Sequence, residues 1–183
     1  MGGVKAIGLP ALNMDIYPLP AVDCVADISD LPFEDSCADG IICEGVLEHV
    51  LEPAKVISEM KRTLKPGGFV FVTILFGAPY HEAPGDYWRW TREGALRLFR
   101  DFEVLELGVK SGPTSTLVDG LRVWLAAVLS FRMRWLFTAL SIGLWLLLGP
   151  LKLIDPLVVR LAGENAMDFA SLFYLIARKK GAV

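Results

Sequence analysis

The chain has 183 residues, enough for one folded domain, and carries 18 Lys and Arg against 21 Asp and Glu, for a net charge of −3. Hydrophobic residues make up 54% and charged residues 21%, which excludes a disordered chain and a strongly basic nucleic-acid-binding protein. The mean hydropathy of +0.47 is high for a soluble domain, so contact with a membrane has to be considered.

Local patterns predict alternating strands and helices. Apolar runs bounded by turn residues predict strands over residues 11–16, 22–27, 40–47, 69–76, 102–109 and 170–178. Glu52-Pro53 opens a predicted helix that ends before Pro66-Gly67-Gly68, and Thr91 is the predicted cap of a helix over 92–100. Strands that alternate with helices predict a parallel α/β sheet.

Three acidic residues fall at the ends of successive predicted strands, namely Asp15, Asp27 and Glu44. Ligands bind at the carboxyl ends of the strands in open parallel sheets. A carboxylate there can accept both hydroxyl hydrogens of a ribose, and another can accept from an adenine amino group. The alternative for any one of them is a solvated loop residue or a helix cap, but three in succession favour a cofactor site.

Three sequence phrases stand in a characteristic order: NMDI, VADISDLPFEDSCADGIICEGVLEHV and EPAKVISEMKRTLKPGGFVFVTI. Together they resemble type 11-like class I S-adenosylmethionine-dependent methyltransferases. The resemblance covers residues 11–112 and extends to 170–180, and it implies a Rossmann-like sheet and S-adenosylmethionine as cofactor. The phrase YHEAPGDYWRWTREGALRLF also resembles a subgroup linked to cell-surface polysaccharide chemistry.

The resemblance implies a role for each strand-end residue. Asp15 would hold the ribose hydroxyls, with Ile16 beside the adenine. Asp27 would accept from the adenine amino group, with Ile28 against the ring. Glu44 would lie near the methionine end of the cofactor. Glu48 and His49 would stand close to the mouth of the substrate site.

The family's first strand and Gly-rich loop should precede Asp15, but few residues do. Gly2 and Gly3 are the candidates for the remainder of that loop, which needs glycine for a close backbone approach to the cofactor. The sequence therefore predicts a methyltransferase sheet that is incomplete at its N-terminus. An upstream start is favoured, and a degenerate protein or a partner chain that fills the gap stays open.

The segment after the strand at 69–76 is the candidate substrate side. Its candidate binding residues offer aromatic faces, a carboxylate and a cation for an anionic group; they are Tyr80, Asp86, Tyr87, Trp88 and Arg89. The alternative for Trp88 and Trp90 is that they anchor a loop.

His81 and His49 are the candidate general bases, because the ordinary pKa of histidine is near neutrality. For His49 the alternative is a structural role in a short helix. They are the chain's two histidines and no metal-ligand spacing is visible, so the sequence predicts no metal site.

An apolar segment interrupts the α/β pattern. Residues 135–151 carry no charge, at the lower limit of length for a membrane span, and Arg132, Arg134 and Lys152 flank them. Trp124, Trp135 and Trp145 would suit a membrane interface.

Topology limits how this segment can meet a membrane. If residues 102–109 and 170–178 share one sheet, the chain leaves and returns on one side, which forbids a single span. The sequence therefore favours a monotopic or re-entrant hairpin at a membrane surface. A buried helical subdomain or a dimer interface is the first alternative, and a true span would require that residues 170–178 are not a strand of the sheet.

The sequence thus predicts three regions: a methyltransferase-like core over 1–112, an apolar helical insertion over 113–168, and the last strand with a basic C-terminus over 169–183. The predicted function is methyl transfer to an oxygen or nitrogen of a small or lipid-linked acceptor such as a sugar. No nucleic-acid partner is expected. The alternative is a degenerate, non-catalytic module that binds a membrane surface or a partner protein. Self-association stays open. We expect the protein to lie in the cytoplasm, at the inner face of the membrane.

Overall fold

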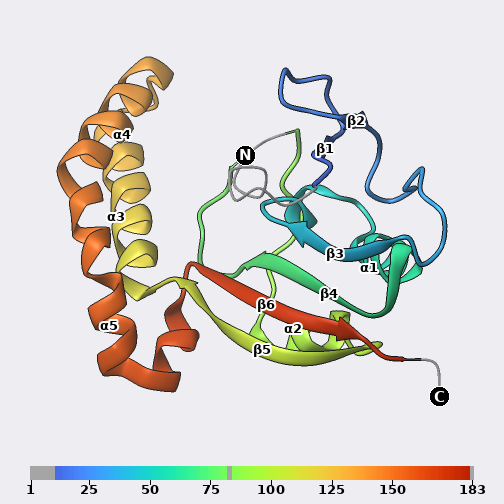
Figure 1. The fold of residues 1–183 in the computed structure, drawn as a ribbon. Coiled ribbons are helices and arrows are strands. Elements are labelled where there is room, and N and C mark those ends of the chain that lie inside the picture. The colour runs from blue at the N-terminus through green and yellow to red at the C-terminus, as the bar shows by residue number, and fades with distance from the viewer. Residues whose placement is uncertain (1–10, 82–83, 182–183) are drawn as a thin grey trace.

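The structure is a computed structural model that describes residues 11–81 and 84–181. The candidate loop residues Gly2 and Gly3 lie outside this range. A four-stranded sheet forms the centre of the α/β part (Figure 1). Its strands lie in the order β3 (Ala38–Cys43), β4 (Leu64–Leu75), β6 (Leu172–Lys179) and β5 (Phe102–Ser111). This mixed α/β architecture agrees with the predicted fold class.

The predicted parallel pairing is confirmed for β3 and β4 and is wrong for the last strand. β3 and β4 are parallel, whereas β6 runs antiparallel to both β4 and β5. The reason is that Ser111, at the end of β5, is paired with Leu172, at the start of β6. The chain therefore leaves and re-enters the sheet at the same end, as in a hairpin with a very long connection, and antiparallel pairing follows.

Two shorter strands form a separate parallel pair: β1 (Met14–Asp15) beside β2 (Cys24–Val25). Both lie within the predicted strand ranges but are shorter. Within the described residues, β3 pairs with β4 alone, so β3 is an edge strand of the larger sheet.

Two helices pack on the sheet, and the residues at their N-termini predicted where each begins. α1 (Pro53–Thr63) has proline in its first turn, where the missing N–H costs nothing, and buries an apolar stripe that includes Val56 and Met60. α2 (Arg92–Leu98) begins after Thr91, whose hydroxyl accepts from the Gly94 N–H at 3.2 Å. Both helices contribute to one hydrophobic core with the inward side chains of β4, which are Val70, Val72 and Ile74.

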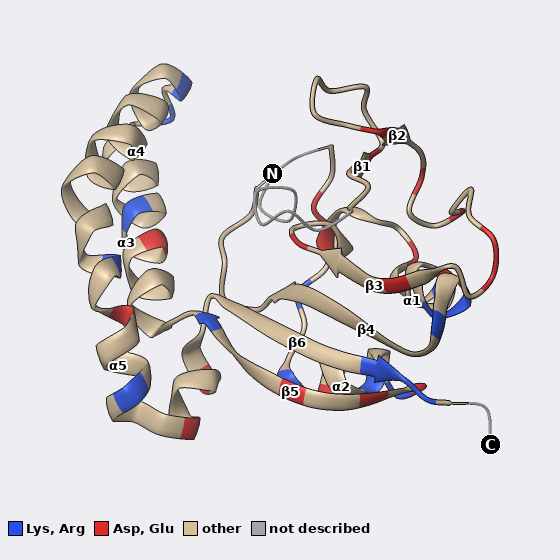
Figure 2. Cartoon of the chain, in the orientation of Figure 1, with Lys and Arg blue, Asp and Glu red and all other residues tan. Residues whose placement is uncertain are grey.

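The insertion is helical, as predicted. It contains α3 (Pro113–Leu129), α4 (Arg134–Leu148), η3 (Gly149–Ile154), α5 (Asp155–Ala162) and η4 (Gly163–Phe169). α3 and α4 form a long hairpin that projects beside the sheet (Figure 1). Figure 2 shows that most charges lie on the α/β part, whereas the hairpin carries few.

Within the described residues, one helical stretch, Arg134–Phe169, has the length and composition of a membrane span. Its most apolar window has a mean hydropathy of 1.8, and 6% of that window is buried. The stretch is therefore not a core helix of this chain. The cysteines Cys24, Cys37 and Cys43 are free thiols, and burial raises the pKa of Cys43 to about 12.

Candidate active site

Asp15 and Asp27 lie at and just after the carboxyl ends of two adjacent parallel strands. Asp15 is the last residue of β1, and its Oδ1 accepts from the Tyr17 N–H at 3.0 Å. Asp27 follows β2, and its Oδ1 accepts from the Ser29 N–H at 2.8 Å. The hydrogen bonds from Ser29 lower the pKa of Asp27, so this carboxylate is an acceptor at neutral pH. An ionised carboxylate has about four acceptor sites, so each turn bond leaves capacity for a ligand.

The two isoleucines beside these acids differ in their surroundings. Ile16 is 56% exposed, so a flat ligand held by Asp15 can pack on it. Ile28 is partly buried and packs against the hydrophobic core. Ile28 therefore contributes to the core as well as to the predicted adenine side.

Glu44 lies at the carboxyl end of β3 and forms an ion pair with Lys110 of β5. The Lys110 Nζ also lies 5.5 Å from the centre of the Phe71 ring, so this lysine lies across one face of the sheet. Gly45 follows with a φ of +64°, a left-handed conformation that favours glycine, and its N–H donates to Thr73 Oγ1 at 3.0 Å. The turn therefore fixes Glu44 at the sheet edge where the cofactor was predicted.

The predicted substrate segment is attached to η2 (Leu47–His49) by several hydrogen bonds. The Tyr87 N–H donates to the Glu48 carbonyl at 2.8 Å, and the Trp88 Nε1–H donates to the Val50 carbonyl at 2.9 Å. The His49 Nδ1 contacts the Gly85 carbonyl oxygen. These contacts place the segment beside Glu48 and His49, as the mouth of a substrate site requires.

Asp86 and Arg89 determine the shape of this segment. The side chain of Asp86 is 1% exposed, and both of its oxygens accept from Arg89. The remaining N–H groups of Arg89 donate to the carbonyls of Ala78, Pro79 and Trp88. All five guanidinium hydrogens are thus engaged, which leaves none for the anionic group that the sequence analysis assigned to Arg89.

The aromatic residues of the segment divide into exposed and anchoring ones. Tyr80, Tyr87 and Trp88 are 70%, 54% and 41% exposed, so a substrate can reach them. Trp90 is buried in the core and stacks with Trp88 at a ring separation of 6.2 Å. Trp90 therefore anchors the loop, which was the alternative considered for it.

His49 and His81 lie together, with Glu48 between them. Their rings meet edge to face at 5.0 Å, and the Nε2 atom of each lies 3.9 Å from Glu48 Oε1. Glu48 is 2% exposed and His81 is 46% exposed. The two candidate bases, which are distant in sequence, thus share one buried carboxylate.

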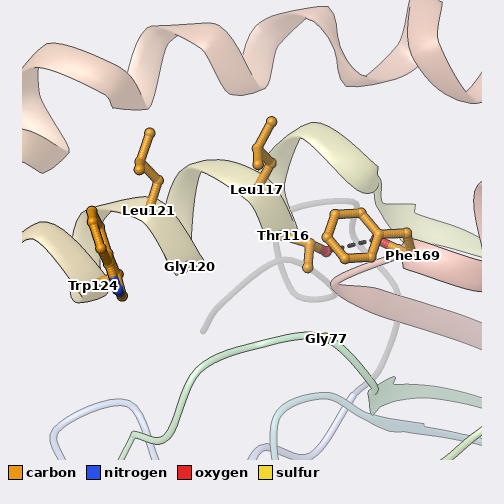
Figure 3. A pocket seen from close by; sticks show the side chains of 7 residues that line it. All are labelled: Gly77, Thr116, Leu117, Gly120, Leu121, Trp124 and Phe169. Carbon is orange, nitrogen blue, oxygen red and sulfur yellow. Dashed lines mark hydrogen bonds between the residues drawn. The ribbon is translucent and has the colours of Figure 1, made fainter.

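A groove absent from the sequence predictions lies between the end of β4 and α3 (Figure 3). Its volume is about 350 Å³, and its lining is mostly apolar: Gly77, Thr116, Leu117, Gly120, Leu121, Trp124 and Phe169. At Gly77, a Cβ would lie 2.7 Å from the Ala170 carbonyl oxygen, so glycine permits this close approach. In the sequence, Gly77 directly after an apolar strand was the one local feature that could have indicated this groove. The residues that face Gly77, on α3 and at Phe169, are distant in sequence and could not be predicted from it.

The chain matches the family model of the methyltransferase domain over residues 12–72. It is 43% identical over 47 residues to a demethylmenaquinone methyltransferase of Clavibacter sepedonicus, a match that covers 26% of this chain and 19% of that protein. It is 41% identical over 49 residues to a tRNA U34 carboxymethyltransferase of Campylobacter curvus, covering 27% of this chain and 16% of that one. The matches therefore span less than a fifth of these relatives.

Solved structures share the fold over most of the chain. The MccD protein has a TM-score of 0.54 at 19% identity, covering 96% of this chain and 82% of that one. The phosphoethanolamine N-methyltransferase 2 of Haemonchus contortus, in complex with S-adenosylhomocysteine, has a TM-score of 0.51 at 19% identity. The match covers 87% of this chain and 38% of that one. At these identities the likeness shows the fold.

The match over residues 12–72 and the shared fold make the α/β part of this chain similar to the class I S-adenosylmethionine-dependent methyltransferases. S-adenosylmethionine is the cofactor of that class. The residues present at the strand ends fit its adenosine part, because Asp15 and Asp27 retain acceptor capacity and Ile16 is exposed.

Proposed function

We propose that this chain binds S-adenosylmethionine at the strand-end acids and transfers its methyl group to an oxygen or nitrogen of an acceptor. The observation that carries the proposal is the position of Asp15 and Asp27 at the carboxyl ends of adjacent parallel strands. In this assignment Asp15 holds the ribose hydroxyls and Asp27 accepts from the adenine amino group. Glu44 stands near the methionine end of the cofactor.

The bound cofactor supplies the electrophilic methyl group, and the chain's own residues position the acceptor and move its proton. His81 is the better placed base, because its side chain is 46% exposed and faces Glu48. The buried Glu48 carboxylate would stabilise the imidazolium that forms when His81 Nε2 takes a proton. Tyr80, Tyr87 and Trp88 would hold the acceptor, while Asp86 and Arg89 keep the segment in shape.

The groove at Gly77 supports an acceptor with an apolar part. It begins directly after β4, where the substrate segment also begins, and it continues along α3 past Leu117, Leu121 and Trp124. Methylene groups that lie in this groove would remove apolar side-chain surface from water, which favours an acceptor with an apolar part. The proposed acceptor is therefore lipid-linked, with its polar head at His81 and its apolar tail in the groove.

The hairpin supports a position at a membrane surface. Trp124, Trp135 and Trp145 are 60%, 69% and 53% exposed. Three charges near the base of the hairpin form ion pairs: Lys152 Nζ lies 2.7 Å from Asp119 Oδ2, and Arg122 Nε lies 3.7 Å from Asp119 Oδ1. The outward surface of the hairpin is therefore largely apolar, as burial in a lipid interface requires.

The dimensions of the hairpin favour an interfacial position over a span. The 15 residues of α4 reach about 22 Å, short of the ~30 Å hydrocarbon core. The longer helical stretch Arg134–Phe169 exceeds that thickness only by including the charged residues Lys152, Asp155 and Arg160. The turn between α3 and α4 also carries Arg132, and Arg134 begins α4. Carrying these arginines through a bilayer would be costly, whereas anionic headgroups would attract them at the surface. We place the protein in the cytoplasm, at the inner face of the membrane.

Transfer of label from S-adenosyl[methyl-³H]methionine to the glycolipid fraction of a membrane extract tests the proposed acceptor. We expect label in the lipid phase with the parent chain, none with Asp15→Ala, and parent-like labelling with Glu52→Gln, a surface carboxylate outside the site. A folded chain that binds the cofactor but labels no lipid would overturn the lipid-linked acceptor.

The second candidate function is a non-catalytic, membrane-binding module, and the exposed apolar hairpin favours it because lipid binding needs no cofactor. The two functions differ in their response to Asp15→Ala. This substitution abolishes cofactor binding and methyl transfer if the chain is an enzyme, and it leaves membrane binding unchanged in both cases.

A further inference from the structure

Glu48, His49 and His81 each offer one metal-ligating atom, and these three atoms lie within 4.8 Å of one another. We propose that the three side chains bind a divalent first-row transition-metal ion such as Zn²⁺. Two imidazole nitrogens and one carboxylate oxygen are ligands that such ions take in proteins. The site rests on this geometry and does not require that the chain transfers methyl groups.

The distances suit an ion between the three side chains. Each Nε2 atom lies 3.9 Å from Glu48 Oε1. Ligand atoms bound at 2.0–2.2 Å to a tetrahedral ion are separated by about 3.4 Å. Small side-chain rotations would close the difference, and the exposed His81 can make them without disturbing the core.

Hydrogen bonds hold both imidazoles in the tautomer that a metal needs. The His49 Nδ1 contacts the Gly85 carbonyl oxygen, and the His81 Nδ1 lies 3.3 Å from the Pro79 carbonyl oxygen. A carbonyl oxygen can only accept, so each Nδ1 carries the hydrogen and each Nε2 presents its lone pair. Metal-bound histidines in proteins commonly donate their second N–H to a carbonyl group in this way.

The buried carboxylate of Glu48 is a second, independent observation that points to a cation site. Its Oε2 atom is buried and has no hydrogen-bond partner among the described residues. A buried polar atom without a partner is costly, more so in a carboxylate. The nearby Arg89 forms its ion pair with Asp86 rather than with Glu48. A cation beside Glu48 would offset this cost.

The arrangement resembles a catalytic rather than a purely structural metal site. Three protein ligands leave one position of a tetrahedral ion open, and the exposure of His81 gives that position access from solvent. An acceptor oxygen bound there would lose its proton more readily. With the ion bound, both Nε2 atoms are ligands, so the metal would replace His81 as the means of activating the acceptor.

Metal titration of the full chain tests this site. Cys24→Ser/Cys37→Ser serves as the background, so that accessible thiols do not contribute. Zn²⁺ is titrated against a chromophoric chelator, Co²⁺ is followed by its visible absorption, and thermal unfolding is recorded with and without Zn²⁺. We expect one equivalent of Zn²⁺ per chain, a raised Tm and a Co²⁺ spectrum of a site with nitrogen and oxygen ligands.

Four variants decide the assignment. His81→Ala and Glu48→Gln should each weaken Zn²⁺ binding at least tenfold, with circular dichroism showing that the chain is folded, while Glu52→Gln binds as the background does. Absence of binding to the folded background protein would overturn the proposal. Binding of Zn²⁺ by His81→Ala and Glu48→Gln as tight as by the background protein would also overturn it. Asp15→Ala should keep the metal and lose the cofactor, which separates this test from that of the methyltransferase function.

Discussion

Arg89 and Asp86 form a two-pronged ion pair that closes the substrate segment on itself. Arg89 Nη2 lies 2.7 Å from Asp86 Oδ2, and Arg89 Nη1 contacts Asp86 Oδ1. Asp86 Oδ2 also accepts from the His81 N–H at 2.9 Å. The pair therefore positions a candidate catalytic residue without touching the acceptor, and it links the stability of the loop to the function of His81.

Asp86→Asn should lower the free energy of unfolding by about 2 kcal/mol, because it removes one charge of a largely buried, doubly hydrogen-bonded pair whose arginine is partly exposed. Urea unfolding measures this change. Asp39→Asn is the matched control, since Asp39 pairs with Lys65 at the surface and should matter little. Equal losses in the two variants would contradict the structural role of Asp86.

The same pair predicts a pH dependence of stability. The Arg89 guanidinium beside Asp86 holds the pKa of that carboxyl well below its usual range. Because the folded-state pKa is lower than the unfolded value of about 3.9, the stabilisation is fully present above that pH and is lost as the pH falls toward the folded-state pKa. The difference in unfolding free energy between the parent and Asp86→Asn should therefore stay constant down to about pH 5 and shrink as the pH falls below about pH 4. A difference that stays constant through this lower range would show that the charge of Asp86 contributes nothing.

Local signals predicted most elements of the α/β part. Pro53 and Thr91 marked the starts of α1 and α2, and the apolar run of β4 marked a strand at the centre of the sheet. The direction of β6 could not be predicted in this way. It depends on where the long helical insertion returns to the sheet, which is a tertiary property of the chain.

The candidate site was predicted as separate residues rather than as clusters. The strand-end acids could be located because each follows its own strand. The contact of His49 with His81 and the ion pair of Glu44 with Lys110 join residues far apart in sequence, so no local pattern reports them. Arg89 was predicted to bind an anion because its partner, Asp86, could not be recognised before the loop was folded.

Asp155 is predicted to hold the hairpin to the rest of the chain. Its carboxylate, which is buried, accepts from the N–H groups of Gly112, Thr114 and Ser115 at the start of α3. Asp155→Ala should cost about 2–3 kcal/mol of unfolding free energy, since it leaves these groups unpaired. Hydrogen exchange should increase selectively in the first turn of α3. Asp168→Ala, at an exposed position of η4, is the control, and equal exchange in both variants would contradict this role.

Membrane binding should depend on the two arginines at the hairpin turn. Arg132→Gln/Arg134→Gln should weaken binding to vesicles of phosphatidylglycerol and phosphatidylcholine at least tenfold, at about 1 kcal/mol per charge. Flotation of the vesicles at low and high salt measures the effect, which should diminish at high salt. Arg97→Gln/Arg100→Gln, at the opposite part of the molecule near α2, is the control. Unchanged binding of the hairpin variant would exclude the proposed orientation.

Calorimetric titration of the purified chain with S-adenosylhomocysteine tests the central claim most directly, because it requires no knowledge of the acceptor. We predict binding in the micromolar range, a loss of at least tenfold with Asp15→Ala, and no change with Asp30→Ala, which alters a neighbouring exposed acid. Circular dichroism establishes that each variant is folded. A folded parent chain that does not bind the cofactor product, or an Asp15→Ala variant that binds it equally well, would contradict the account.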